Sequence, residues 1–144
     1  MNVNDITYRI IGSAYKVYNK LGPGLLESVY QEALCYQLIK DGLHVESQLQ
    51  VPLYYDEVEL QTKLRLDILV EDNVIVELKS VDALAPVHFL QIDTYLRLTN
   101  RKVGLLINFN TDDIKSSIHR RINSFDLDVQ LNKNDKLDNG ISVK

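Results

Sequence analysis

Cysteine is almost absent from this chain of 144 residues, which contains Cys35 alone. A single cysteine excludes an internal disulfide bond, and no Cys and His residues follow the spacing of a structural zinc site. Cys35 lies within an apolar helical pattern, where a buried thiol is expected rather than a nucleophile. The cytoplasm is therefore the expected location.

Long hydrophobic runs are absent as well, and no stretch approaches the roughly 20 apolar residues that span a membrane. Residues 1–5 show neither the basic nor the apolar region of a signal peptide.

The content of 45% hydrophobic and 25% charged residues is ordinary for a globular protein. The length suits one core. We expect a single domain over residues 1–125 and a polar, frayed tail over residues 126–144.

Positive charge is also scarce, because the formal net charge is −4. Proteins that bind duplex DNA usually carry a basic surface, since neutralised phosphates supply much of their affinity. The charge balance argues against tight, non-specific DNA binding. It does not exclude a nuclease, because a bound metal offsets carboxylates and basic residues can gather locally.

The most informative stretch lies between residues 65 and 79. Two β-rich segments, residues 65–70 and 74–79, flank the polar break at residues 71–73, which predicts a β-hairpin. In that register Asp67 faces Glu77 and Arg65 faces Lys79. One face is then wholly apolar, and a slip of one residue would mix the charged and apolar sets. This apolar face consists of Leu66, Ile68, Val70, Val74, Val76 and Leu78.

Two carboxylates and a lysine would converge on the other face of this hairpin. Carboxylates a few ångströms apart raise each other's pKa unless a cation compensates, and Mg²⁺ or Mn²⁺ suits oxygen ligands. Asp67 and Glu77 are therefore candidate metal ligands, and the backbone carbonyl of Leu78 is a further one. Lys79 would orient a water molecule or stabilise charge on a phosphate. The alternative is a solvated strand face with chance ion pairs.

The order of these motifs resembles the PD-(D/E)XK nuclease superfamily. Asp67 on one strand, Glu77-x-Lys79 on the next and Gln91-x₃-Tyr95 on a following helix resemble its RecB-like branch. Residues 24–30, Gly-Leu-Leu-Glu-Ser-Val-Tyr, match the GxxExxY signature that names one family within the superfamily. Residues 86–88 and 104–109 are similar to later segments of that family. The resemblance runs from residue 6 to residue 122, with Leu66 in place of the proline in the superfamily's name.

The resemblance implies a restriction-endonuclease-like α/β fold: a mixed four-stranded sheet flanked by helices, in the order ααβββαβα. It also implies hydrolysis of phosphodiester bonds with Mg²⁺ or Mn²⁺, in DNA more than in RNA. Glu27 would help to hold the metal, while Gln91 and Tyr95 would position the phosphate or the attacking water. A homodimer would enlarge the binding surface, but nothing in the sequence sets the stoichiometry.

Several of these residues also have structural explanations. Glu27 is a favourable carboxylate in the first turn of a helix, and Tyr30 either packs beneath the site or touches a phosphate. Gln91 and Tyr95 are four residues apart, so they share one helix face and could form an ordinary polar flank. His88 could cap the helix, bind a ligand or pack. A catalytically silent binding or assembly module with this fold is the rival function.

The hydrophobic periodicity predicts the remaining elements. A first helix is expected over residues 6–20, and a second helix follows the break at residues 22–24 and ends near residue 40. A third helix is expected over residues 86–98, and strands are expected at residues 43–53 and 102–109. Apolar residues cover so much of the second helix that we expect it to be buried on more than one side. A last helix over residues 112–122 would carry the densest basic patch, either as a solvated face or as a contact for nucleic-acid backbone. This patch consists of Lys115, His119, Arg120 and Arg121.

Overall fold

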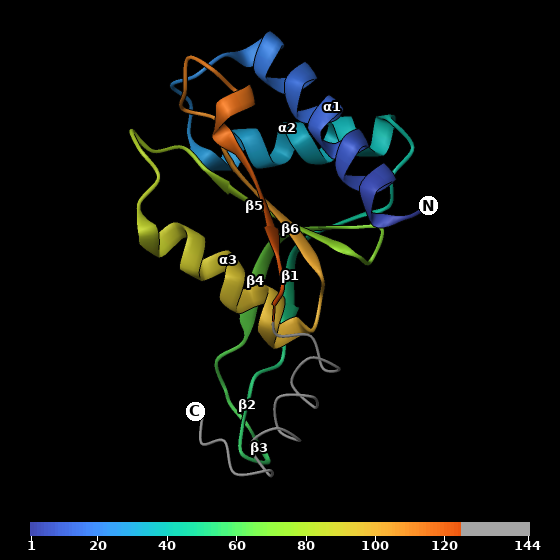
Figure 1. Cartoon of the computed structure of the whole chain (residues 1–144), viewed down its shortest axis with the longest axis vertical. Coiled ribbons are helices and arrows are strands. Elements are labelled where there is room, and N and C mark those ends of the chain that lie inside the picture. Colours follow the sequence, from blue (N-terminus) through green and yellow to red (C-terminus); the bar gives the residue numbers. More distant parts are fainter. Residues whose placement is uncertain (125–144) are drawn as a thin grey trace.

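The computed structural model describes residues 1–124 and consists of two packed helical layers around one mixed β-sheet (Figure 1). The expected tail over residues 126–144 lies outside the described residues. In chain order the elements are α1 (Val3–Leu21), α2 (Glu27–Lys40), β1 (Val45–Val51), β2 (Tyr54–Tyr55), β3 (Val58–Glu59), β4 (Leu64–Val70), β5 (Val74–Lys79), α3 (Pro86–Thr99), β6 (Val103–Asn108), the 3₁₀ turn η1 (Lys115–Ser117) and β7 (Ile118–Ile122).

The main sheet has five strands in the order β1-β4-β5-β6-β7. Strands β5 and β6 are parallel and are joined by α3, whereas the other neighbours are antiparallel. Helices α1 and α2 cover one face and α3 the other, while the small β2–β3 hairpin projects from the body (Figure 1). This is the predicted mixed α/β architecture with helices on both sides, although the sheet has five strands rather than four.

The predicted last helix is wrong. Residues Ile118–Ile122 form β7, an edge strand that pairs antiparallel with β6, and only Lys115–Ser117 are helical, as a 3₁₀ turn. Isoleucines at 114, 118 and 122 have helical spacing, but without β7 the outer edge of β6 would keep unpaired backbone groups. Pairing along a buried strand outweighs the local periodicity, and this accounts for the fifth strand.

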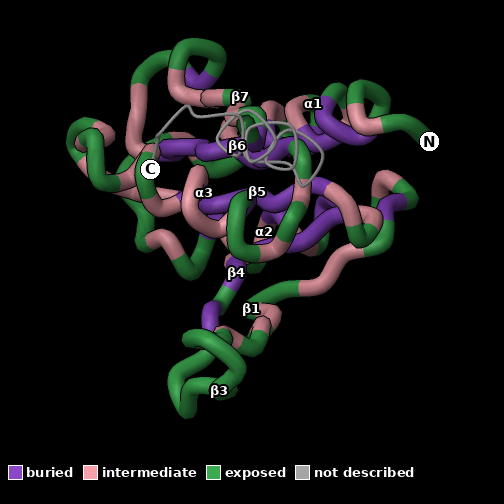
Figure 2. The backbone as a smooth tube through the Cα atoms, turned by 60° about the horizontal axis from the view of Figure 1, so that its bottom comes forward, coloured by how far each residue is buried: buried purple, intermediate pink, exposed green. Residues whose placement is uncertain are grey.

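The larger core lies between the sheet and helices α1 and α2. It unites the inner faces of both helices with the apolar face of the β4–β5 hairpin, including Ile68, Val76 and Leu78. Figure 2 shows the continuous buried path along β5 and β6. Tyr30 of α2 is fully buried there and stacks on Phe109, with ring centroids 4.6 Å apart and planes at 6°. This stack fixes α2 against the end of β6.

A smaller core lies between the sheet and α3. Leu96 packs there with Leu69 and Ile75. Leu66 belongs to this core rather than to the face of Ile68, which corrects its predicted assignment. Leu66 lies beyond the pair of Ile68 and Val76, where the β4–β5 ladder ends, and next to Asp67, which has no partner on β1.

Helix α3 lies close against the sheet at Gly104 of β6. A Cβ atom at this glycine would lie 2.9 Å from Cδ1 of Ile92 and 3.2 Å from the carbonyl oxygen of Ile75. Such contacts are shorter than van der Waals packing allows. The absence of a side chain at Gly104 therefore sets the height of α3 above the sheet.

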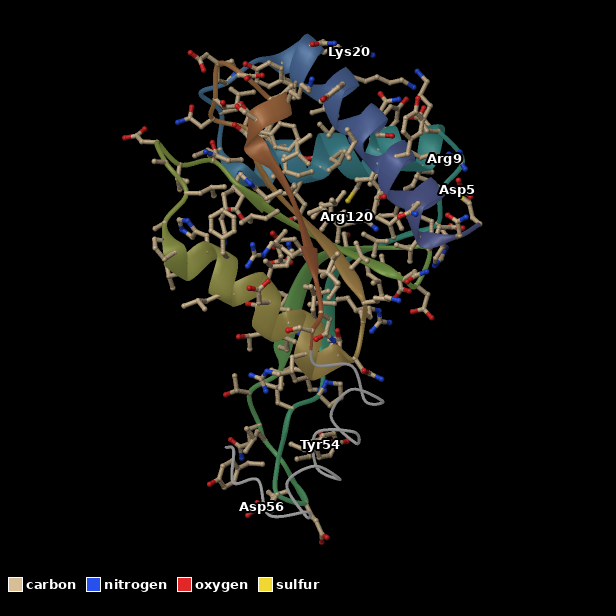
Figure 3. All side chains as sticks on the ribbon, viewed as in Figure 1. Asp5, Arg9, Lys20, Tyr54, Asp56 and Arg120 are labelled. Carbon is tan, nitrogen blue, oxygen red and sulfur yellow. The ribbon has the colours of Figure 1, made fainter. Side chains whose placement is uncertain are left out.

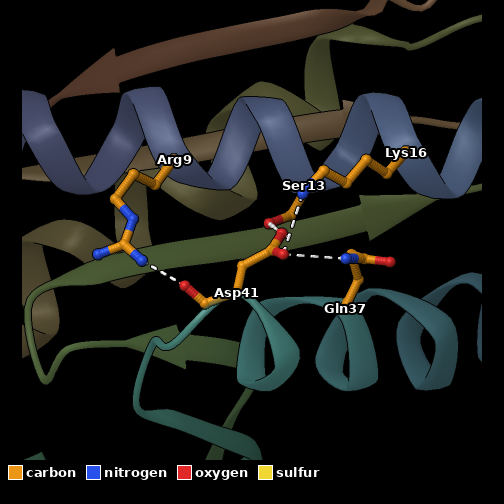
Figure 4. A network of polar contacts seen from close by, with 5 residues as sticks. All are labelled: Arg9, Ser13, Lys16, Gln37 and Asp41. Carbon is orange, nitrogen blue, oxygen red and sulfur yellow. Dashed lines mark hydrogen bonds and ion pairs between the residues drawn. The ribbon is translucent and has the colours of Figure 1, made fainter.

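Asp41, directly after α2, ties the two N-terminal helices together (Figure 4). Its carboxylate accepts hydrogen bonds from Ser13 at 2.6 Å, from Lys16 at 3.0 Å and from Gln37 at 3.1 Å. The guanidinium of Arg9 also donates to the backbone carbonyl of Asp41. The side chains of α1 thus hold the end of α2 in place.

Helix α2 is not buried on more than one side, contrary to the prediction. The row containing Tyr30, Leu34 and Leu38 is buried, but the second apolar row is open: Leu26 is 73% exposed and Tyr36 is 69% exposed. Within residues 1–124 only one face of α2 packs against the sheet and α1. Apolar content alone therefore overstated the burial of this helix.

Candidate active site

Six of the candidate site residues predicted from the sequence line one open cleft of about 670 Å³ on the α3 side of the sheet. They come from four elements: α2, β4, β5 and α3. Leu78 does not line the cleft, because its side chain is fully buried in the larger core. The six residues are Glu27, Asp67, Glu77, Lys79, Gln91 and Tyr95.

Asp67 and Glu77 lie where the β4–β5 hairpin opens. Its register is as predicted near the turn, with Val70 opposite Val74, and the ladder ends at the pair of Ile68 and Val76. Beyond it, Glu77 Oε2 accepts the backbone N–H of Asp67 at 2.8 Å. Asp67 Oδ2 accepts the N–H of Leu78 at 2.9 Å. Each carboxylate therefore takes the place of a backbone acceptor of the opposite strand.

Glu27 is held beside this pair by the loop that precedes α2. The hydroxyl of Tyr30 donates to the carbonyl of Gly22 at 2.5 Å and accepts from the N–H of Leu25 at 3.2 Å. Ser80, just after β5, donates its hydroxyl to the carbonyl of Leu25 at 2.6 Å. Of the two roles considered for Tyr30, packing beneath the site is the one observed, because its side chain is buried and does not line the cleft.

Burial makes the two hairpin carboxyls difficult to ionise. Glu77 is only 2% exposed, and its burial, reinforced by the neighbouring Asp67, raises its pKa to about 8. Burial also raises the pKa of Asp67, whereas the hydrogen bond from Leu78 and the cations Lys79 and Arg65 lower it. Buried acids without a bound counter-ion behave in this way, and a cation placed between them would restore their charge.

Glu27 and Lys79 belong to the same electrostatic system. Burial is the main cause of a raised pKa at Glu27, and Asp67 raises it further. The ammonium group of Lys79 lowers the pKa values of Glu27, Asp67 and Glu77. Four ionisable groups from three elements are thus close enough to influence one another, as expected for a functional site.

Helix α3 presents Gln91 and Tyr95 to the cleft as a hydrogen-bonded pair. Gln91 Nε2 donates to the hydroxyl of Tyr95 at 3.0 Å, one helical turn away. Burial raises the pKa of Tyr95, and the carboxylates of Glu77 and Asp67 add to this effect. His88 does not line the cleft; its Nδ1 accepts the N–H of Ala85 at 2.9 Å, so it caps α3.

The donor set suits a hard divalent cation. Within residues 1–124 no group of three His, Cys, Asp or Glu side chains is arranged to hold a metal ion by itself. Mg²⁺ is commonly bound through one or two carboxylates, several waters and the phosphates of its substrate. Asp67 and Glu77 fit that mode, and Glu27 lines the same cleft.

Sequence reasoning missed three polar residues of this cleft, Gln50, Gln61 and Lys63, and it placed Arg65 opposite Lys79 without giving it a role in the site. The available signal was strand alternation, because residues 63, 65 and 67 are spaced by two along the approach to β4. The basic patch of residues 115–121 lies elsewhere. Arg121 forms an ion pair of 2.6 Å with Asp93, and Arg120 donates to Asn4, far from the β2–β3 hairpin in Figure 3.

The fold and the cleft define a nuclease-like α/β protein with acidic residues at an opened central hairpin. In agreement, the sequence profile of the PD-(D/E)XK nuclease superfamily matches residues 4–121. The chain therefore belongs to the PD-(D/E)XK nuclease superfamily, and this membership suggests nuclease activity. The superfamily predicted from the motifs is confirmed.

Other comparisons add the fold alone. The crystal structure of SSO0001 superposes with a TM-score of 0.53 and 19% sequence identity over 76% of this chain. This chain spans 57% of the length of that protein. No curated protein matches the sequence. Among residues 1–124, no helix has the length and apolar character needed to cross a membrane.

Proposed function

We propose that this protein hydrolyses phosphodiester bonds of nucleic acid, DNA rather than RNA, with Mg²⁺ or Mn²⁺ as cofactor. The observation that carries the proposal is the meeting of Asp67, Glu77 and Lys79 with Gln91 and Tyr95 in one cleft. These residues belong to β4, β5 and α3, and two of the carboxyls have raised pKa values that a cation would reverse. A solvated strand face would not bury Glu77.

Asp67 and Glu77 would hold the metal, with the carbonyl of Leu78 as a further ligand and Glu27 assisting directly or through water. A divalent cation at this position supplies Lewis-acid stabilisation of negative charge on a phosphate. The match of residues 24–30 to GxxExxY and of Gln91-x₃-Tyr95 to the RecB-like branch supports these roles. We also propose a cytoplasmic location.

The residues of the chain divide the hydrolytic step among them. Lys79 would orient the attacking water and stabilise the charge that develops on the phosphate oxygens. Gln91 and Tyr95 would hold the phosphate in line with that water. The water oxygen forms a new bond to phosphorus, the bond to one bridging oxygen breaks, and the proton released by the water balances the proton gained by the leaving oxygen.

Titration calorimetry with Mn²⁺ and Mg²⁺, wild type beside Asp67→Asn, tests the metal site. We expect binding in the wild type that is lost in the variant, because the substitution removes a charge and keeps the shape. Incubation with linear, branched and single-stranded DNA, and with RNA, then tests cleavage. Asp93→Asn is the matched control, since Asp93 lies on α3 in an ion pair with Arg121 outside the cleft.

The net charge of −4 favours the rival function of a silent binding or assembly module. That function predicts neither metal binding nor cleavage with DNA present. If both assays are negative with DNA and Mn²⁺ together, the nuclease proposal fails.

A further inference from the structure

Asp67 occupies a gap in the pairing between β1 and β4. Of the seven residues of β4, Asp67 alone has no partner on β1: Ser47 pairs with Ile68 and Leu49 with Leu66, while Gln48 and Asp67 between them do not pair. The same register continues on both sides of the gap. The ladder to β5 also ends before Asp67. The backbone of this residue is therefore not held by regular strand pairing on either side.

Hydrogen bonds from side chains hold the backbone of Asp67 instead. The N–H of Asp67 donates to Glu77, as described above, and its carbonyl oxygen accepts from Gln31 Nε2 of α2 at 3.4 Å. Gln31 Oε1 in turn accepts from Gln48 Nε2 at 2.6 Å. The two amides thus form a chain from the unpaired residue of β1, through α2, to the unpaired residue of β4.

Gln48 reaches this position through an unusual backbone. Its φ is +50°, in the left-handed region that residues other than glycine rarely adopt. Gln48 is exposed and belongs to neither hydrophobic core, so packing does not require this conformation. A backbone of this kind persists where its surroundings enforce it, and such positions cluster at functional sites.

We propose that Gln31 and Gln48 are positioning residues for Asp67, and that their amide bridge sets the angle at which its carboxylate meets a bound metal. This inference rests on the proposed function. A glutamine amide both donates and accepts, so Gln31 can receive Gln48 and hold the carbonyl of Asp67 at once. A methionine of similar size would do neither. A glutamate would place a negative charge beside Asp67 and lose the donor.

The test is the Mn²⁺ dissociation constant of the full chain, measured by titration with electron paramagnetic resonance, beside urea unfolding in EDTA. For Gln31→Met we expect binding weaker by about tenfold, the usual scale for residues that orient a ligand. Glu32→Gln, at the neighbouring exposed position of α2, is the matched control and is expected to bind within about twofold of the wild type.

Gln48→Gly separates positioning from support of the fold. Glycine suits a φ of +50°, so metal-free stability is expected to hold or rise, whereas Mn²⁺ binding weakens because the bridge is lost. A purely structural role would move both quantities in the same direction. The double variant is expected to bind no worse than Gln31→Met alone, because the two amides act as one bridge.

Several results would overturn the inference. If Gln31→Met and Gln48→Gly both bind Mn²⁺ as tightly as the wild type, the positioning role is wrong, while the proposed function stands. Affinity and stability that fall together in Gln48→Gly overturn it as well. No Mn²⁺ binding by the wild type overturns both the inference and the proposed function. If Gln31→Met does not fold, Gln48→Gly decides the question. The side chain of Gln48 is exposed, so its removal is not expected to prevent folding.

Discussion

Asp67 and Glu77 are joined by exchanged side-chain-to-backbone hydrogen bonds. Glu77 accepts the N–H of Asp67 at 2.8 Å, and Asp67 accepts the N–H next to Glu77, that of Leu78, at 2.9 Å. The exchange begins where the β4–β5 ladder stops, so opening the hairpin and placing two carboxyls in the cleft are one structural event.

The stability of the metal-free protein is expected to fall as the pH rises from 5 to 8.5. Burial raises the pKa of Glu77 from 4.5 to about 8, so the folded chain binds this proton more tightly than the unfolded chain. Stabilisation is complete below pH 4.5 and is lost as the pH passes 8. We expect a fall in Tm of about 10 °C or more in EDTA, measured by calorimetry. Glu77→Gln, which does not titrate, is expected to lose most of this dependence.

A divalent cation is expected to reverse that loss. Because Asp67 and Glu77 must be deprotonated to bind, the rise in Tm with Mn²⁺ is expected to be larger at pH 8 than at pH 6. At a hundred times the dissociation constant the rise at pH 8 is expected to be about 5 °C. Thermal scans with Asp67→Asn are expected to show no rise, and Asp93→Asn the full rise. An equal shift in all three proteins would point to non-specific binding.

Lys79 and Lys63 are expected to affect different kinetic constants. Lys79 acts electrostatically on all three acidic groups, so Lys79→Met is expected to lower kcat by about a hundredfold or more while Mn²⁺ still binds. Lys63 lines the same cleft but is not among the main causes of their pKa shifts, so Lys63→Met is expected mainly to raise KM, with a larger effect at low salt. Steady-state kinetics on an oligonucleotide substrate distinguishes the two. Identical profiles would contradict the assigned roles.

Gly104→Ala is expected to destabilise the protein by about 1–3 kcal/mol, because the added methyl group meets Ile92 and the backbone of Ile75. Urea unfolding measures this change. Ile92→Val in the same chain is expected to recover part of the loss. Gly12→Ala is the matched control: nothing lies within 4 Å of the added carbon in α1, so a gain of up to about 1 kcal/mol is expected.

Local patterns predicted the central hairpin because its faces are chemically distinct. The break at residues 71–73 and the alternation around it fixed one register, and the observed pairs Val70–Val74 and Ile68–Val76 agree with it. Helix α3 begins at Pro86, as its sequence indicates, because proline suits the first turn of a helix. Where strand parity or a strong helix start decides the outcome, a short sequence window suffices.

Longer-range features could not be predicted in this way. The isoleucines at 114, 118 and 122 have helical spacing, but residues 118–122 pair with the outer edge of β6 as a strand. This edge is formed by the folded sheet, so a short sequence window does not reveal it. Leu66 packs in the smaller core beside α3, and strand alternation in the sequence placed it on the opposite face. The contribution of Gln31 and Gln48 likewise depends on α2 lying against that interruption.

The sequence by itself determined which chemical groups are available, Asp67, Glu77, Lys79, Glu27, Gln91 and Tyr95, and which of them share a strand or a helix face. Only the tertiary structure decided that they line one cleft and that Glu77 is buried deeply enough to retain its proton near neutral pH. The physical reason is that alternation and helical period act over a few residues. Burial and electrostatic coupling depend on elements far apart in the chain.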